Sequence, residues 1–174
     1  VLVDISHVGN VTGRETVDAS SQPIAITHGN PIAFCDSPRN KPDELVSAVA
    51  ERGGVIGCTL YPLFMGGADV TRSEYCGMVA ALSEQIGVEH VAIGSDAVLG
   101  WSPDALGWMR NGRWDRATGP SAAPSFPSWP KWFDGPKDFG SLSDGLDGAG
   151  FTSIERDLVL GGNWLRLFGE VFPS

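Results

Sequence analysis

The chain has 174 residues, of which 42% are hydrophobic and 19% charged, as expected of one globular domain with a sizeable core. Its net charge is −9, from 12 basic and 21 acidic residues. That balance argues against nucleic acid or an anionic membrane as a partner, because both attract clustered Lys and Arg. No apolar run approaches the ~20 residues of a membrane-spanning helix, and no signal peptide is visible. We expect a cytoplasmic location, or a periplasmic one if residues upstream carry a signal.

Two short apolar runs near the amino terminus each lead to a histidine. Residues 1–5 lead to His7, and residues 23–26 lead to His28. The intervening residues 11–21 are long enough for a crossover helix, so we expect neighbouring parallel strands that bring both imidazoles to their carboxyl ends. Active sites of α/β folds lie at that end, and two neutral imidazoles there form a plausible half of a divalent metal site. The alternative is two unrelated polar residues that finish their strands.

A helix and a third strand follow. Proline and acids at Pro42-Asp43-Glu44 predict a helix start, and Gly53-Gly54 predicts its end. Residues 55–61 then read as a strand that ends in Tyr61. Tyr61 would line a pocket at the carboxyl end of the sheet, and simple packing of its ring is the alternative.

The next unit repeats this order. Thr71 and Glu74 have the spacing of a capping box, and the helix that they start should end near Gly87. Residues 91–94 predict a fourth strand that delivers Asp96 to its carboxyl end. Four strand–helix units imply a parallel sheet, either a small open one or half of an eight-stranded barrel.

Regularity fails over residues 97–140, where five of the six tryptophans lie. We expect a lid-like insertion above the site, with a short helix over residues 103–109; an aromatic extension packed on the outside is the alternative. The chain then ends in helices. One covers residues 142–149, Thr152 caps another, and Gly161-Gly162-Asn163 should bend or break the last.

The remaining histidine and the cysteines receive structural interpretations. His90 precedes the fourth strand, so we place it at the amino-terminal end of the sheet, away from the site. The three cysteines are an odd number without metal-ligand spacing. Cys58 and Cys76 are interpreted as small buried apolar residues.

Six blocks in this order resemble the membrane dipeptidase (renal dipeptidase) family of zinc peptidases, and its bacterial branch in particular. The blocks are Asp4-Ile5-Ser6-His7-Val8, Thr27-His28-Gly29-Asn30, Cys35-Asp36-Ser37-Pro38-Arg39-Asn40, Glu51-Arg52-Gly53-Gly54-Val55-Ile56-Gly57, Gly87-Val88-Glu89-His90-Val91-Ala92-Ile93-Gly94-Ser95-Asp96 and Gly161-Gly162-Asn163-Trp164-Leu165-Arg166. They run from the first residues nearly to the last, which makes the resemblance specific.

The resemblance implies the second half of a (β/α)8 barrel with two zinc ions at the carboxyl ends of its strands. His7 and His28 match the histidines of the second zinc, and Arg39 matches the arginine that holds the substrate carboxylate. Asp96 matches the aspartate that carries a proton between water and the leaving amine. Two metals about 3.5–4 Å apart would activate a water and polarise the scissile carbonyl. A planar guanidinium suits a free carboxylate better than lysine does.

The ligands of the first zinc and the bridging glutamate belong to the amino-terminal half of the family, and this chain lacks them. The run after Asp96 also departs from the family's usual phenylalanine and second aspartate. We therefore expect a single domain over residues 1–174 that is a fragment of a zinc dipeptidase acting on dipeptides with a free carboxyl terminus. It would be inactive alone. Its expected partners are the dipeptide, the amino-terminal half of the barrel and, in a homodimer, a second copy. A non-catalytic binding homologue, a half-barrel that needs a partner chain and a related metal-dependent amidohydrolase are the alternatives.

Overall fold

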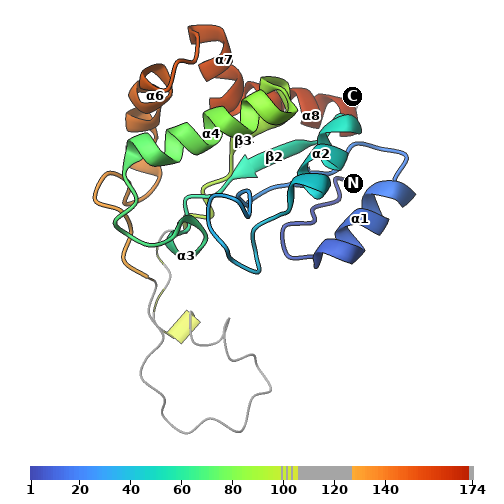
Figure 1. Ribbon diagram of the computed structural model, residues 1–174, viewed down its shortest axis with the longest axis horizontal. Coiled ribbons are helices and arrows are strands. Elements are labelled where there is room, and N and C mark those ends of the chain that lie inside the picture. The colour runs from blue at the N-terminus through green and yellow to red at the C-terminus, as the bar shows by residue number, and fades with distance from the viewer. Residues whose placement is uncertain (99, 101, 103, 106–126, 173–174) are drawn as a thin grey trace, which may run out of the picture.

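A computed structural model describes residues 1–98, 100, 102, 104–105 and 127–172 (Figure 1). Its centre is a parallel sheet in the order β1 (Ala25–Ile26), β2 (Val55–Cys58) and β3 (Val91–Ile93). The register pairs Ala25 with Val55 and Ile56 with Val91. Parallel pairing of consecutive units is as the sequence predicts.

The prediction of a full first strand is wrong, since residues 1–5 contribute a single parallel bridge between Asp4 and Ala25. Two backbone bonds flank it, from Ile5 N to Ala25 O and from Ala25 N to Val3 O, both 2.9 Å long. The ladder stops because the amides of Ser6 and Thr27 donate to the Asp4 carboxylate, at 3.0 Å each. A side chain thus takes the donors that a longer strand pair would use.

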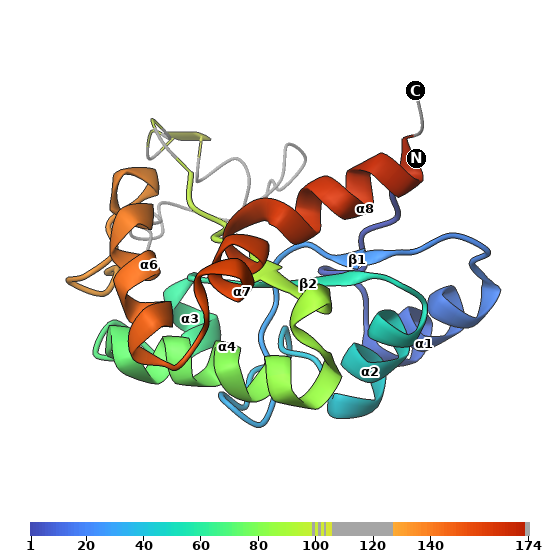
Figure 2. The same cartoon turned by 90° about the horizontal axis from the view of Figure 1, so that it is seen from above.

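Helices cover both faces of the sheet, as Figure 2 shows. α1 (Asn10–Ala19), α2 (Asp43–Glu51) and α4 (Arg72–Ile86) lie on one side, and α8 (Asn163–Val171) lies on the other. None of the helices in the described part is both long and apolar enough to cross a membrane.

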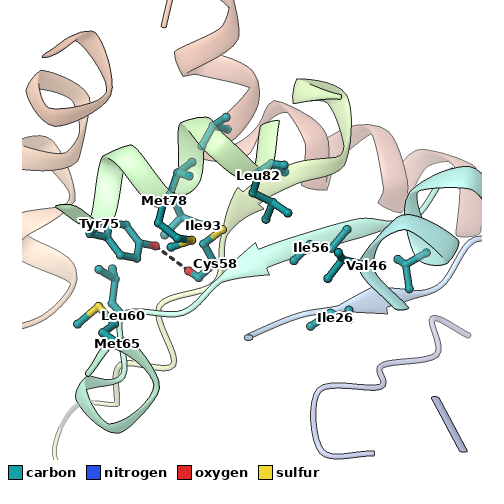
Figure 3. Packing of buried hydrophobic residues seen from close by; sticks show 14 of the residues in the cluster. Ile26, Val46, Ile56, Cys58, Leu60, Met65, Tyr75, Met78, Leu82 and Ile93 are labelled. Carbon is teal, nitrogen blue, oxygen red and sulfur yellow. Dashed lines mark hydrogen bonds between the residues drawn. The ribbon is translucent and has the colours of Figure 1, made fainter. Parts of the chain in front are cut away.

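The interior beneath α4 is tightly packed (Figure 3). Tyr75 is fully buried, and its hydroxyl donates to the carbonyl of Cys58 at 2.8 Å. Cys58 and Cys76 are buried, as predicted, and burial raises the pKa of the Cys58 thiol to about 12 and that of Cys76 to about 11. The predicted capping box also forms, because Thr71 accepts from the Glu74 amide and Glu74 accepts from the Thr71 amide.

The third predicted strand is shorter than expected, because β2 ends at Cys58. The backbone N–H and C=O of the next residue, Thr59, bond to the Asn30 side chain instead of to a strand. Tyr61 therefore does not end the strand; it precedes α3 (Pro62–Met65), a helical turn that the sequence reading missed. Proline at the first position and the left-handed Gly66 after the last were its signals.

The carboxyl-terminal part corrects one boundary and confirms one break. Residues 132 and 133 do not pack on the outside, the alternative considered for this segment, because Phe133 is fully buried and Trp132 Nε1 donates to the Val70 carbonyl at 2.8 Å. A 3₁₀ turn, η2 (Pro136–Asp138), leads directly into α6 (Phe139–Gly148), which starts earlier than residue 142. Only residues 104 and 105 of the predicted helix over residues 103–109 are described. Trp101, Trp108 and Trp114 lie outside the described residues, so the lid stays a prediction.

The last helices follow the predicted break. α7 (Ser153–Asp157) has its own capping box between Thr152 and Glu155. A π-helical turn, η3 (Leu158–Gly162), then separates it from α8, and Gly161 inside this turn has an extended, non-helical φ of 171°. A second 3₁₀ turn, η1 (Val88–His90), comes just before β3.

Candidate functional site

His7 and His28 converge beyond the carboxyl ends of their strand segments, as predicted. Their Nε2 atoms are 2.8 Å apart, and their ring centroids are 4.9 Å apart at an interplanar angle of 61°. Two imidazole nitrogens on one tetrahedral zinc lie about 3.3 Å apart, given zinc–nitrogen distances of about 2.0–2.1 Å. A small opening of the pair would therefore seat one ion. No group of three or more His, Cys, Asp or Glu side chains in the described residues is arranged to hold a metal. The histidine pair could supply two ligands.

The surroundings of His7 bring three other predicted site residues, His28, Arg39 and Asp96, into one neighbourhood. Its pKa is lowered by burial first, and then by the positive charges of Arg39 and of His28 when protonated. The carboxylates of Asp96 and Asp4 act in the opposite direction on the same pKa. Because a metal binds the neutral imidazole, a lowered pKa favours the ligating form near neutral pH.

Two polar residues beside the histidines were missed by the sequence reading. The Thr27 hydroxyl lies 2.9 Å from His28 Nδ1 and donates to Asp4 Oδ2 at 2.7 Å. The Ser6 hydroxyl donates to Asp4 Oδ1 at 2.6 Å and accepts from the His28 amide at 3.0 Å. Asp4 therefore receives four hydrogen bonds from these two segments. Burial raises its pKa, but the bonds from Ser6 and Thr27 outweigh burial and lower it overall.

Arg39 presents unused hydrogen-bond donors. Its guanidinium carbon lies 5.0 Å from the centre of the Phe64 ring, a cation–π contact. Its Nε and Nη2 atoms are buried and bond to none of the described residues. Buried unpaired donors are costly unless a ligand supplies acceptors, and a carboxylate matches the guanidinium fork.

Two buried asparagines hold the Arg39 loop against α3. Asn30 Nδ2 donates to the carbonyls of Thr59 and Phe64 at 3.1 and 3.0 Å. Asn40 Nδ2 donates to the same Phe64 carbonyl at 3.0 Å. The sequence signal was available, because Asn40 directly follows Arg39 and Asn30 lies two residues after His28.

Lys41 joins the same loop to the first histidine. Its side chain is buried, and Nζ donates to the carbonyl of Val8 at 2.7 Å. Burial and the charge of Arg39 lower its pKa, while Asp4 raises it. The loop that carries Arg39 is thus fixed to the residue after His7.

Asp96 and Tyr61 lie in the segments that follow β3 and β2, beyond the carboxyl ends of these strands. Asp96 has a φ of 57°, and among the described residues no other non-glycine has a positive φ. Such conformations gather at functional sites, and aspartate tolerates them better than most residues. The Tyr61 ring packs against Phe64 at 5.1 Å and edge-on to Trp129 at 5.9 Å. These contacts favour the packing interpretation, and a role in substrate binding stays a prediction.

His90 lies at the opposite end of the sheet. It ends η1, before β3 begins, and its Nδ1 is 2.9 Å from the Gly54 carbonyl. Its place fits the structural interpretation.

Known proteins resemble this chain over nearly its whole length. The profile described as "Membrane dipeptidase (Peptidase family M19)" matches residues 1–108. Dipeptidase aclJ of Aspergillus oryzae is 26% identical over 174 residues, which cover 98% of this chain and 35% of that protein. An amidohydrolase structure from Pseudomonas aeruginosa is 27% identical with a TM-score of 0.86, over 100% of this chain and 53% of that one.

A metallo peptidase structure from Rhodobacter sphaeroides, solved with a phosphinate mimic of the dipeptide L-Ala-D-Ala, has the same fold at a TM-score of 0.75. It is 18% identical, over 97% of this chain and 42% of that one. This chain thus spans between about a third and a half of the length of these three relatives. With a family match over residues 1–108, parallel strands in the predicted order and two histidines converging at their ends, the chain belongs to the membrane dipeptidase family of metallopeptidases, peptidase family M19.

Proposed function

We propose that this chain is the carboxyl-terminal half of a zinc dipeptidase barrel that cleaves dipeptides with a free carboxyl terminus. The observation that carries the proposal is Arg39, whose buried Nε and Nη2 atoms have no acceptor among the described residues. It lies close enough to His7 for its charge to lower the pKa of that imidazole. A dipeptide carboxylate on Arg39 would place the scissile bond beside the histidine pair.

In this proposal His7 and His28 hold one zinc through their Nε2 atoms. A zinc ion held there would supply Lewis acidity toward the scissile carbonyl and toward a water molecule. Asp96 accepts the proton of the attacking water and returns it to the leaving amine. This role requires the Asp96 carboxylate to lie within hydrogen-bond reach of both groups. Arg39 binds and orients the substrate. Further metal ligands would come from the amino-terminal half; in support, this chain spans 53% of its amidohydrolase relative.

The test is hydrolysis of a dipeptide and of its carboxyl-terminal amide, with zinc, by this chain joined to an amino-terminal half of the family. Arg39→Lys keeps the charge but loses the fork, so it should chiefly raise KM for the free acid. Asp96→Asn should chiefly lower kcat. Equal turnover of acid and amide would remove the carboxylate-binding role of Arg39. This chain alone should be inactive, and robust turnover by it would overturn the half-barrel part of the proposal.

A second candidate is a metal-dependent amidohydrolase with a non-peptide substrate, which the relative from Pseudomonas aeruginosa favours by its description. Hydrolysis of amides without an α-carboxylate, unaffected by Arg39→Lys, would support it. A non-catalytic homologue would bind metal or ligand without turnover of either substrate.

A further inference from the structure

The Thr27 hydroxyl sets the proton arrangement on His28. Thr27 has one hydroxyl proton. Its neighbour at 2.7 Å is Asp4 Oδ2, and an ionised carboxylate has no proton to donate, so the hydroxyl donates to it. The same oxygen lies 2.9 Å from His28 Nδ1. With its proton committed to Asp4, the hydroxyl can only accept there, so Nδ1 must carry the ring proton. That leaves Nε2 of a neutral His28 with its lone pair free.

The contact between the two histidines then follows. A 2.8 Å separation of Nε2 atoms requires one proton between them. Since Nε2 of His28 has none, His7 donates from its own Nε2 in the metal-free protein. The two imidazoles are therefore opposite tautomers, and the metal-ready nitrogen is that of His28.

Asp4 is itself held in one orientation. Its Oδ1 accepts from the Ser6 amide, the Ser6 hydroxyl and the Thr27 amide at 3.0, 2.6 and 3.0 Å. Only Oδ2 is left to face the Thr27 hydroxyl. The carboxylate cannot turn without breaking these three bonds.

We propose that Asp4, acting through the Thr27 hydroxyl, is a positioning residue that fixes His28 in its Nδ1–H form with Nε2 free for a metal. The inference deepens the proposed function, on which its metal part rests. Ligating histidines commonly donate their second nitrogen to such an outer partner, and loss of the partner weakens metal binding about 10–100-fold. Here the partner is a hydroxyl backed by a carboxylate.

The experiment reads the tautomers directly by long-range ¹H–¹⁵N NMR of the metal-free chain at about pH 8, where neutral imidazoles dominate. The chain has three histidines, so single His→Gln variants assign the signals. We expect His28 to be protonated on Nδ1 and His7 on Nε2. Asp4→Asn should reverse both, because its Oδ1 would keep the three donors and its amide would donate to Thr27. The Thr27 hydroxyl would then donate to Nδ1.

Three further variants test the series of hydrogen bonds from Asp4 through Thr27 to His28, here called the relay. Thr27→Val should leave His28 a mixture of tautomers, and Thr27→Ser should restore the wild-type pattern. Asp18→Asn, at an exposed carboxylate that pairs with Arg14, should change neither histidine. An unchanged His28 tautomer in both Asp4→Asn and Thr27→Val, with dispersed amide spectra showing that the variants fold, would overturn the proposal.

Calorimetry with zinc separates this inference from the proposed function. Thr27→Val and Asp4→Asn should bind zinc about 10–100-fold more weakly than wild type, and Thr27→Ser about equally. If the wild-type chain binds no zinc while the tautomers respond as expected, the relay stands and the metal proposal fails. If zinc binds but the tautomers do not respond, the relay fails alone.

Discussion

The two faces of the sheet are packed by opposite means. Toward α2 and α4 the strands present large side chains, including Ile26, Ile56 and Ile93. Toward α8 they present Ala25, Val55 and Ala92, which pack with Leu167. The first face excludes water by bulk. On the second face, backbone atoms and a tryptophan ring can approach the strands closely, because the strand side chains there are small.

The close approach on the α8 face involves the candidate site. The Thr27 carbonyl sits against Gly57 and Gly94, where an added Cβ would overlap it. A Cβ on Gly57 would also lie 2.8 Å from the Trp164 ring. Thr27 precedes His28, so the small-residue face sets the position of a proposed metal ligand as well as contributing to stability.

Gly94→Ala should have the largest effect, because its methyl group would collide with the Thr27 carbonyl. We expect a loss of about 3 kcal/mol of unfolding free energy, measured by urea titration. Gly77→Ala is the matched control, since Gly77 lies inside α4 with open space around its Cβ position. It should be neutral or stabilise by about 0.5–1 kcal/mol. Similar losses of unfolding free energy in both variants would mean that the contact between Gly94 and the Thr27 carbonyl leaves room for a methyl group.

Alkaline pH should weaken the large-residue face. The pKa of the Cys58 thiol rises from 9.0 to about 12, with burial the main cause. Between these values the folded state keeps a proton that the unfolded state has lost, so stability falls as pH rises above about 9. Each such group contributes about 1.4 kcal/mol per pH unit. Urea titrations at several pH values should show a shallower fall in Cys58→Ala, and an unchanged slope would contradict this assignment.

Tyr75→Phe should cost about 1 kcal/mol, because it removes the hydrogen bond to the Cys58 carbonyl. The loss is modest since that carbonyl also accepts from the Gly94 amide at 2.9 Å. Thermal unfolding would measure this loss of stability. A loss well above that of Leu82→Ala would show that the Tyr75 hydroxyl stabilises the fold through more than this one hydrogen bond.

Trp164→Phe should have the smallest effect on stability, about 0.5–1 kcal/mol, from loss of the bond between Nε1 and the Ile93 carbonyl at 2.9 Å. It should nevertheless shift the His28 ring signals in NMR, because Trp164 lies on the face that seats Thr27. The matched change Tyr75→Phe should leave those signals in place. If both variants shifted them equally, the two faces would not differ in their control of the site.

Local rules in the sequence determined the elements that depend on neighbouring residues. The capping box at Thr71 and Glu74 needs partners three residues apart, and the break at Gly161 needs only a flexible backbone, so both were predictable. The convergence of His7 and His28 followed from strand order, because parallel strands end at the same edge.

Tertiary structure decided what depends on distant partners. The Asn30 side chain ends β2 by bonding to the backbone of Thr59, 29 positions further along the chain. Asp4 shortens the first strand by accepting a hydrogen bond from the Thr27 amide, 23 positions further along. No periodicity encodes such side-chain bonds, because their geometry exists only once the segments have met. For the same reason the sequence pointed to the two histidines, while only the folded chain showed the Asp4 and Thr27 groups that orient one of them.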